Sequence, residues 1–216
     1  MNTPFYANEF LQYRTIIVAN GEFPSDASAL MLLKNAKKII CCDGAITHLE
    51  KLNILPTLIM GDGDSISPEQ LMKYKEIWIE NRDINYSDLH KSIRYCIEQG
   101  EKSVAIIGGG GLREDHQLAN FSMLITYGKL INMMMVTNFG IFTPLFSTTT
   151  LSSFKGQQIS IFNFSAAKLT FFQLKYLVKD KVFNYFWEGS LNEATASNFT
   201  IQFDSGKVLV FRVFLP

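Results

Sequence analysis

The 216-residue sequence has no excess of charge of either sign, because 20 lysine and arginine residues balance 20 aspartate and glutamate residues. Proteins that coat nucleic acids or anionic membranes usually carry a basic excess, since neutralised phosphates supply most of their affinity. We therefore expect a protein that binds neither nucleic acid nor membrane. Hydrophobic residues make up 47% of the chain and charged residues 19%, a balance that is too apolar for intrinsic disorder.

Cysteine is also scarce, and no apolar run is long. Cys41, Cys42 and Cys96 are odd in number, and neighbouring cysteines rarely bridge each other because disulfide geometry resists it. A reducing compartment suits such a chain. Residues 1–10 lack the basic segment and long apolar run of a secretory signal, and no stretch approaches the roughly 20 apolar residues of a membrane helix. We expect a cytoplasmic protein.

Two regions of different composition meet near Gly140. The first 140 residues hold 16 of the 20 acidic residues and 11 of the 14 glycines, whereas residues 141–216 hold 13 of the 18 phenylalanines. This contrast predicts two domains, 1–140 and 141–216.

In the first domain, short β-branched runs alternate with helical patterns, which predicts a three-layer α/β domain with a mostly parallel sheet. The expected strands are 15–19, 39–42, 58–60, 77–79, 104–107 and 133–136. In the second domain, period-two and aromatic runs between turn signals predict a β-sandwich. Its expected strands are 158–164, 169–177, 183–187, 199–203 and 208–214.

Three helices of the first domain have clear boundaries. Ser67, followed by proline and by Gln70 three residues later, is the start of a capping box. Ser87 offers a similar cap for a helix that ends at Gly100. A third helix is expected over 116–127.

Polar and acidic residues follow five of the expected strands, at the ends where an open parallel sheet binds ligands. Because the carboxyl ends of parallel strands meet at one edge, we expect these residues to form a single rim. The five segments are 20–22, 43–44, 61–65, 83–88 and 108–116.

The residue types on this rim predict a phosphate site organised by Mg²⁺. This ion takes hard oxygen ligands, usually a few carboxylates with water and substrate phosphates. Glycines 108–111 let backbone N–H groups approach phosphate oxygens at a helix N-terminus, and Arg113 can hold a phosphate through two hydrogen bonds. The candidate metal ligands are Asp62, Asp64, Asp88 and Asp115.

Each motif also has a structural interpretation. Asp-Gly and Gly-Asp pairs are common in turns, and Asp88 would favour the first turn of a helix without any ligand. A calcium EF-hand that starts at Asp62 is excluded, because its twelfth residue would be Lys73 rather than glutamate. The glycine run matches neither a Walker A loop nor a dinucleotide fingerprint. We expect His116 to be structural and His90 to lie at the surface, and no nucleophile is evident.

In their order along the chain, these motifs resemble those of the thiamine pyrophosphokinase family. The resemblance spans most of the sequence, and the motifs are specific together although each is weak alone. The matching segments are 20–22, 43–45, 56–66, 83–88, 111–120, 174–176 and 189–193.

The resemblance implies an enzyme that transfers pyrophosphate from ATP to the hydroxyl group of thiamine and releases AMP. It implies an α/β domain that binds Mg-ATP and a β-sandwich that completes the thiamine site, usually across a homodimer interface. The implied cofactor and partners are therefore Mg²⁺, ATP, thiamine and a second copy of the chain.

The resemblance also implies roles for individual residues. The acids of the metal and phosphate site would be Asp62, Asp64, Asp88 and Asp115. The nucleotide would be bound by Asn20, Asp43, Gly44, Ser87, Gly110, Gly111 and Arg113. Thiamine would be bound by Ser190, Asn192 and Tyr176, whose ring suits a cationic thiazolium. Positioning and charge neutralisation dominate such a transfer, so the metal and Arg113 would supply most of the catalysis. Asp88 and Asp115 would either bind the metal or orient the thiamine hydroxyl.

Several positions depart from the pattern of the family. Gly63 stands in place of an aromatic residue, Asn85 in place of an aspartate, and Leu112 in place of a glycine. The thiamine motif reads Gly-Ser-Leu-Asn at 189–192, and 197–198 is an alternative register for it.

Two other functions remain open from the residues. One is a nucleotide-sugar transferase in which the pair of aspartates at 62 and 64 binds a metal diphosphate, although this leaves segments 83–88 and 113–115 unexplained. The other is a non-catalytic nucleotide or thiamine sensor, which would bind ATP and metal without turnover.

Overall fold

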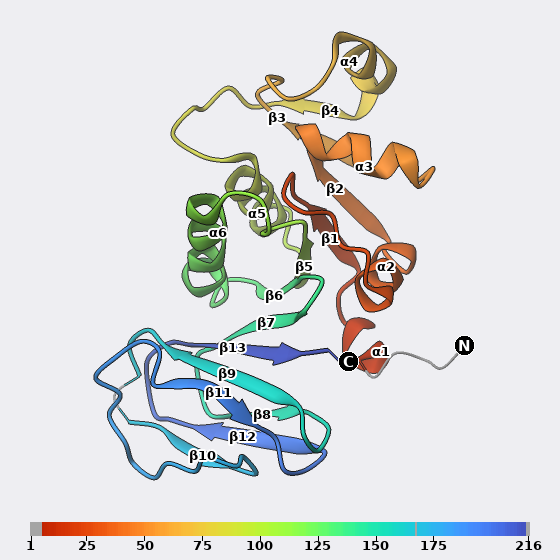
Figure 1. Ribbon diagram of the computed structural model, residues 1–216. Coiled ribbons are helices and arrows are strands. Elements are labelled where there is room, and N and C mark those ends of the chain that lie inside the picture. Colours follow the sequence, from red (N-terminus) through yellow and green to blue (C-terminus); the bar gives the residue numbers. More distant parts are fainter. Residues whose placement is uncertain (1–5, 167, 215–216) are drawn as a thin grey trace. The chain divides into compact units, whose positions relative to one another are not determined.

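A computed structural model describes residues 6–166 and 168–214, which group into two compact units (Figure 1). The first unit contains the described residues up to Met123 together with Leu130–Asn138. The second contains Leu124–Lys129 and the described residues from Phe139 onward. Residues 1–5 of the N-terminal segment considered for a secretory signal lie outside the described residues.

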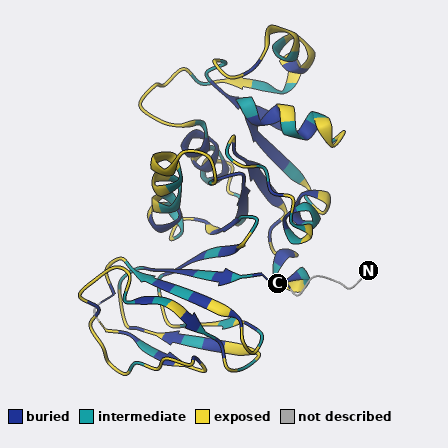
Figure 2. Ribbon diagram, viewed as in Figure 1, coloured by how far each residue is buried: buried dark blue, intermediate teal, exposed yellow. Residues whose placement is uncertain are grey.

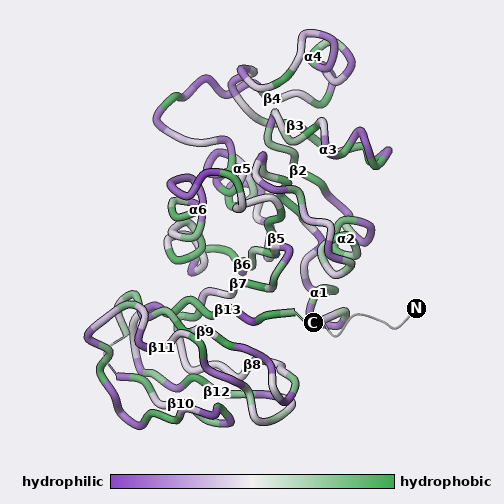
Figure 3. Tube along the Cα trace, viewed as in Figure 1, coloured by the Kyte–Doolittle hydropathy of each residue, from purple (hydrophilic) through white to green (hydrophobic). Residues whose placement is uncertain are grey.

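The sheet of the first unit has six strands in the order β6-β5-β1-β2-β3-β4, and each neighbouring pair is parallel. The order reverses at β1, which lies between β2 and β5. The central strands are buried and hydrophobic (Figures 2 and 3), as expected for a parallel sheet with both faces covered. The strands are β1 (Thr15–Val18), β2 (Lys38–Cys42), β3 (Leu58–Gly61), β4 (Trp78–Glu80), β5 (Ser103–Ile107) and β6 (Asn132–Val136).

Helices cover both faces of this sheet, with α5 and α6 on one side and α2 and α3 on the other (Figure 1). The prediction of a three-layer α/β fold is therefore confirmed. The helices are α1 (Ala7–Phe10), α2 (Ala27–Lys34), α3 (Ile46–Lys51), α4 (Pro68–Tyr74), α5 (Asp88–Glu98) and α6 (Glu114–Tyr127), with short 3₁₀ turns η1 (Asp43–Ala45) and η2 (Lys75–Ile77).

The predicted helix starts are confirmed at two caps. Ser67 Oγ accepts a hydrogen bond from Gln70 N, and Gln70 Oε1 accepts one from Ser67 N, so the capping box of α4 is complete. Ser87 Oγ accepts a hydrogen bond from His90 N at 3.4 Å at the start of α5. The expected third helix begins at Glu114, two residues earlier than its pattern suggested.

The second unit is a sandwich of two antiparallel sheets, β11-β9-β13-β7 and β10-β12-β8. Their inner faces share one core, in which Phe171 and Phe199 of the smaller sheet join Ile159, Ile161 and Val210 of the larger. The predicted β-sandwich is thus confirmed. Its strands are β7 (Gly140–Leu145), β8 (Thr149–Ser152), β9 (Gln158–Asn163), β10 (Thr170–Phe172), β11 (Gly189–Glu193), β12 (Asn198–Gln202) and β13 (Val208–Val213).

Parts of the strand prediction for the second unit are wrong. The segment 183–187 forms turns instead of a strand: Phe183 packs into the sandwich core, while Tyr185 and Trp187 are exposed and stack with ring centroids 5.7 Å apart. Of the expected strand 169–177, only Thr170–Phe172 is regular. The predicted elements did not include strands β7, β8 and β11 or helices α1 to α3. None of the helices in the described part of the chain has the length and apolar character needed to cross a bilayer.

Candidate active site

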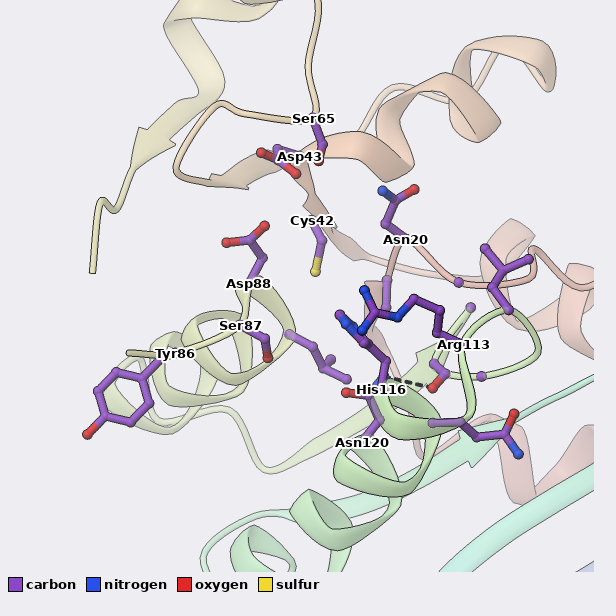
Figure 4. A pocket seen from close by; sticks show the side chains of 18 of the residues that line it. Asn20, Cys42, Asp43, Ser65, Tyr86, Ser87, Asp88, Arg113, His116 and Asn120 are labelled. Carbon is purple, nitrogen blue, oxygen red and sulfur yellow. Dashed lines mark hydrogen bonds between the residues drawn. The ribbon is translucent and has the colours of Figure 1, made fainter. Parts of the chain in front are cut away.

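A cavity of about 370 Å³ opens at the carboxyl ends of β1, β2, β3 and β5 in the first unit (Figure 4). This is the edge where the strand order reverses, the usual ligand site of an open α/β sheet. The loops after these strands and the first turns of α5 and α6 form its wall. The predicted site residues on the wall are Asn20, Asp43, Asp62, Asp64, Ser87, Asp88, Gly110 and Arg113.

Three carboxylates of this wall form a cluster. Asp43, Asp62 and Asp64 each place one oxygen so that these atoms lie within 4.8 Å of one another. Asp43 is buried, Asp62 is half-buried and Asp64 is exposed. Three negative charges at this separation repel, and hard oxygen donors of this kind suit Mg²⁺. The donor set therefore fits a divalent cation.

The carboxylate of Asp43 is held from two loops. Its Oδ1 accepts a hydrogen bond from Gly44 N at 2.6 Å, and its Oδ2 accepts one from Gly63 N at 3.2 Å. Gly61 makes this approach possible, since a Cβ atom there would lie within 2.8 Å of the Asp43 carboxyl group. Gly63 has a φ of +89°, which residues other than glycine rarely adopt. Asp43 thus ties the turn after β3 to the turn after β2.

Asp88 is the first residue of α5 and faces the same cavity (Figure 4). Its Oδ1 accepts a hydrogen bond from Lys91 Nζ at 3.0 Å, and the Lys91 side chain is 3% exposed. Burial raises the pKa of Asp88 to about 6 in spite of this bond. The charges of Asp43 and Asp62 raise the pKa of Asp88 as well.

The glycine run after β5 is fixed by hydrogen bonds to its carbonyl groups. Gly21 N, Glu22 N and Asn120 Nδ2 donate to the carbonyls of residues 108–110 over distances of 2.7 to 2.8 Å. Residues 108–110 line the cavity immediately before α6. Their backbone is therefore held in place where it can approach a bound anion.

Arg113 and Asp115 form an exposed pair at the start of α6. Arg113 Nη2 donates to Asp115 Oδ2 at 2.6 Å and Nε donates to Oδ1 at 3.1 Å. This pairing lowers the pKa of Asp115 and raises that of Arg113. Arg113 lines the cavity across from Asp88 (Figure 4), together with His116, whereas Asp115 is not among the residues that line it.

Three predicted residues of the first unit lie off the wall of the cavity. They are Gly44, Gly111 and Asp115. Gly44 lies directly behind the side chain of Asn20, and Gly111 donates its N–H to Gln117 Oε1 at 2.8 Å. These contacts place Gly44 and Gly111 as supports for residues that line the cavity.

Sequence reasoning missed some features of this wall. Asp43 belongs to the acidic cluster rather than standing apart from it. The buried Lys91 was not singled out, although its position three residues after Asp88 is a signal for an ion pair on a helix. The expectation that His90 lies at the surface is wrong: it is buried and stacks on Tyr86 with ring centroids 4.2 Å apart. Cys42 also lines the cavity, and burial raises its pKa to about 12.

The predicted thiamine-side residues belong to the second unit. Asn192 is buried, where its Oδ1 accepts from Tyr176 N and Glu193 N and its Nδ2 donates to Tyr176 O, all at 2.8 to 3.0 Å. These bonds hold the backbone of Tyr176, whose ring is exposed. Ser190 is half-buried, and its neighbour Leu191 is exposed with a positive φ of 57°. The alternative pair at 197–198 is exposed at the start of β12.

Two family models match this chain and together cover most of it. The model described as "Thiamin pyrophosphokinase, catalytic domain" matches residues 29–136, and the model described as "Thiamin pyrophosphokinase, substrate-binding domain" matches residues 140–211. The chain belongs to the thiamin pyrophosphokinase family.

Similar proteins support this membership of the thiamin pyrophosphokinase family. The chain is 32% identical over 119 residues to Thiamin pyrophosphokinase 1 of Caenorhabditis elegans, across 50% of this chain and 48% of that protein. It is 24% identical over 152 residues to Thiamine pyrophosphokinase 1 of Oryza sativa subsp. japonica, across 59% of this chain and 57% of that protein. The chain thus spans about half the length of the curated relatives it matches.

Solved structures with the same fold include further members of the thiamin pyrophosphokinase family. The thiamine pyrophosphokinase of Bacillus subtilis superposes with a TM-score of 0.80 at 20% identity, across 93% of this chain and 98% of that chain. The thiamin pyrophosphokinase of Candida albicans superposes with a TM-score of 0.80 at 16% identity, across 95% of this chain and 90% of that chain. These similarities establish the fold.

Proposed function

We propose that the protein is a thiamine pyrophosphokinase, which transfers the pyrophosphoryl group of ATP to the hydroxyl of thiamine and releases AMP. The observation that carries this proposal is the convergence of Asp43, Asp62, Asp64, Asp88 and Arg113 on one cavity in a chain of this family. A polyphosphate needs both a cation site and a cationic side chain, and this wall offers residues for both.

Asp43, Asp62 and Asp64 are the residues that would hold Mg²⁺. Their carboxylate oxygens are close together and of the chemical type that this ion binds. A bound Mg²⁺ offsets the charge of the phosphates and of the group that leaves. Asp43, fixed by backbone N–H groups from two loops, would supply the most rigid ligand of the three.

Asp88 is proposed to orient the thiamine hydroxyl and to accept its proton. It lies outside the cluster of three acids, and its pKa near 6 keeps it ionised at neutral pH while leaving it able to take up a proton. The hydroxyl oxygen forms a bond to the β-phosphorus, and the bond from that phosphorus to the α-phosphate oxygen breaks, so that AMP leaves. Arg113 is proposed to bind a phosphate after exchanging Asp115 for it, next to the fixed glycine run.

The two domains would divide the substrates between them. Residues 1–140 are proposed to bind Mg-ATP, and residues 141–216 to contribute to thiamine binding through Tyr176 and Ser190. Asn192 would act mainly by holding the backbone of Tyr176, because its amide group already bonds the backbone on both sides. The names of the two matching family models, catalytic domain and substrate-binding domain, support this division.

We also propose that the protein is a cytoplasmic homodimer. Its three cysteines are free thiols, which suits a reducing compartment. The segment from Tyr176 to Leu191 exposes several large apolar side chains, and monomers rarely leave many of these in water. They are Tyr176, Leu177, Val182, Tyr185, Phe186, Trp187 and Leu191. Light scattering after size exclusion tests the dimer, and a Trp187→Ser variant should weaken it if this segment forms the interface.

One assay separates the possible functions. The purified protein is incubated with ATP, Mg²⁺ and thiamine, and AMP, ADP and thiamine diphosphate are quantified. We expect AMP that depends on thiamine and equals the thiamine diphosphate formed. ADP with thiamine monophosphate would instead indicate an ordinary kinase. Binding of ATP and metal without product would indicate a sensor, and neither binding nor product would refute the proposal.

A further inference from the structure

One lysine of α5 is buried, in contrast to its neighbour on the same helix. The side chain of Lys91 is 3% exposed, whereas that of Arg94 is 54% exposed and pairs with Glu98 at the surface. Lysine is rarely buried to this degree, because a charged ammonium loses its hydration unless a partner replaces the water. Lys91 therefore does not serve as an ordinary surface charge, and its burial points to a specific role.

The partner of Lys91 is an acid that the proposed chemistry uses. Lys91 Nζ donates to Asp88 Oδ1 at 3.0 Å across one turn of α5. The helix packs on β2 and β3, and the Oγ atom of Ser92 lies 3.7 Å from the Sγ atom of Cys42 in β2. These contacts fix this part of α5 on the sheet. The ion pair is thus attached to a rigid element at the wall of the cavity.

Lys91 also offsets charge where the cavity is most negative. Asp88 shares the wall with Asp43, Asp62 and Asp64, so it faces other carboxylates as well as the space for the substrate. Among the described residues that line the cavity, Arg113 is the single arginine. Its side chain is exposed and already pairs with Asp115. Lys91 is the buried cation behind this acidic side of the wall.

We infer that Lys91 is a positioning residue for the transfer, which holds Asp88 by Oδ1 so that Oδ2 is the oxygen left to receive the thiamine hydroxyl. This inference rests on the proposed function. Lys91 touches neither substrate in this scheme and acts only through Asp88. A fixed carboxylate with one oxygen occupied presents the other in a single direction, which is what orientation of a hydroxyl requires.

The test compares Lys91→Met with Lys91→Arg and with Arg94→Met as a matched control on the same helix. For Lys91→Met, we expect kcat to fall at least tenfold while the KM for ATP stays within twofold of wild type. Lys91→Arg should recover at least a third of the lost activity, because it keeps the positive charge beside Asp88. Arg94→Met should leave both constants within twofold. Mn²⁺ affinity, followed by the electron paramagnetic resonance of the free ion, should not fall in any of the three variants, since none of them removes a carboxylate of the cluster of three acids.

A double variant shows whether Lys91 acts through Asp88. If it does, Asp88→Asn with Lys91→Met should have the same kcat as Asp88→Asn alone, within twofold. The inference would be overturned if Lys91→Met lowered kcat in the Asp88→Asn background by the same factor as in the wild type. It would also be overturned if Lys91→Met alone were as active as Arg94→Met. Thermal melts check that each variant is folded, and Lys91→Gln, which keeps a hydrogen-bond donor, carries the same comparison if Lys91→Met does not fold. An inactive wild-type protein would instead refute the proposed function itself.

Discussion

Replacing Asp88 by asparagine should strongly reduce turnover and at the same time make the protein more stable at neutral pH. The physical reason is that ionised Asp88 is unfavourable in the folded state: its pKa rises from 3.8 to about 6 even though the bond from Lys91 lowers it. The amide oxygen of an asparagine can still accept this bond from the buried Lys91. A rise of this size corresponds to a ceiling of about 3 kcal/mol, at about 1.4 kcal/mol per pKa unit. Because Asp88 is partly exposed and solvent screens its charge, we expect a gain of about 1 to 2 kcal/mol in the free energy of unfolding.

The sign of the effect depends on pH in a definite way. Between pH 4 and 6 the unfolded chain loses the proton of Asp88 while the folded protein keeps it, so this group lowers the stability of the wild type as the pH rises. Well below pH 3.8 the group is protonated in both states and the destabilisation disappears. The advantage of Asp88→Asn should therefore be small at pH 4, grow through pH 5 and reach its full size above pH 6.

Urea unfolding in the presence of a chelator measures this difference without metal. Trp78 lies in the first unit and Trp187 in the second, so a Trp187→Phe background lets tryptophan fluorescence report on the unit that contains Asp88. Asp83→Asn is the control, since Asp83 is exposed and accepts hydrogen bonds from Asn85 that lower its pKa. The control should not be more stable than wild type. If the difference in unfolding free energy between Asp88→Asn and the wild type is the same at pH 4 and pH 7, the reasoning is refuted. If Asp88→Asn has normal turnover, the proposed role of Asp88 is refuted.

Three other variants test the site and its supports. Asp64→Asn should reduce turnover to below about 1% of wild type while changing the free energy of unfolding by less than about 0.5 kcal/mol, because Asp64 is exposed; near-normal AMP formation would contradict its role as a metal ligand. Gly61→Ala should weaken Mn²⁺ binding at least tenfold, measured by paramagnetic resonance, since the added methyl group displaces the Asp43 carboxylate; unchanged binding would show that Asp43 is not a ligand. Asn192→Ala should lower the free energy of unfolding by about 2 to 4 kcal/mol, because it removes three hydrogen bonds between a buried side chain and the backbone of Tyr176 and Glu193. Urea unfolding checks this value, and a loss under about 0.5 kcal/mol would show that the bonds are dispensable.

Local patterns were enough to predict much of the first unit. Its strands are short apolar runs between turns, and the caps at Ser67 and Ser87 depend on residues within three positions of each other. The rule that ligands bind beyond the carboxyl ends of parallel strands then placed distant acids at one edge. Their meeting at the cavity follows from the parallel order of the strands, so no knowledge of side-chain contacts was needed.

The features that were missed depend on contacts that the sequence does not encode locally. A lysine on a helix is usually exposed, so the burial of Lys91 follows only from the packing of α5 on the sheet. Phe183, Tyr185 and Trp187 alternate as in a strand, but only Phe183 enters the sandwich core. The alternation at these positions therefore belongs to a loop, in which Phe183 packs into the core while Tyr185 and Trp187 stay exposed. Asp115 is likewise bound by Arg113, two residues away, instead of lining the cavity.

The pairing of Arg113 with Asp115 has a consequence for which anions the rim retains. A phosphate that reaches Arg113 exchanges one ion pair for another, and the net gain is the difference between two similar attractions in water. Small anions that contact only Arg113 should thus bind weakly and dissociate quickly. A longer anion that also binds at the far side of the cavity keeps its phosphate near the guanidinium through those other contacts, which favours the exchange with Asp115. Because Arg113 is already paired with Asp115, it should select anions by their length more than by their charge.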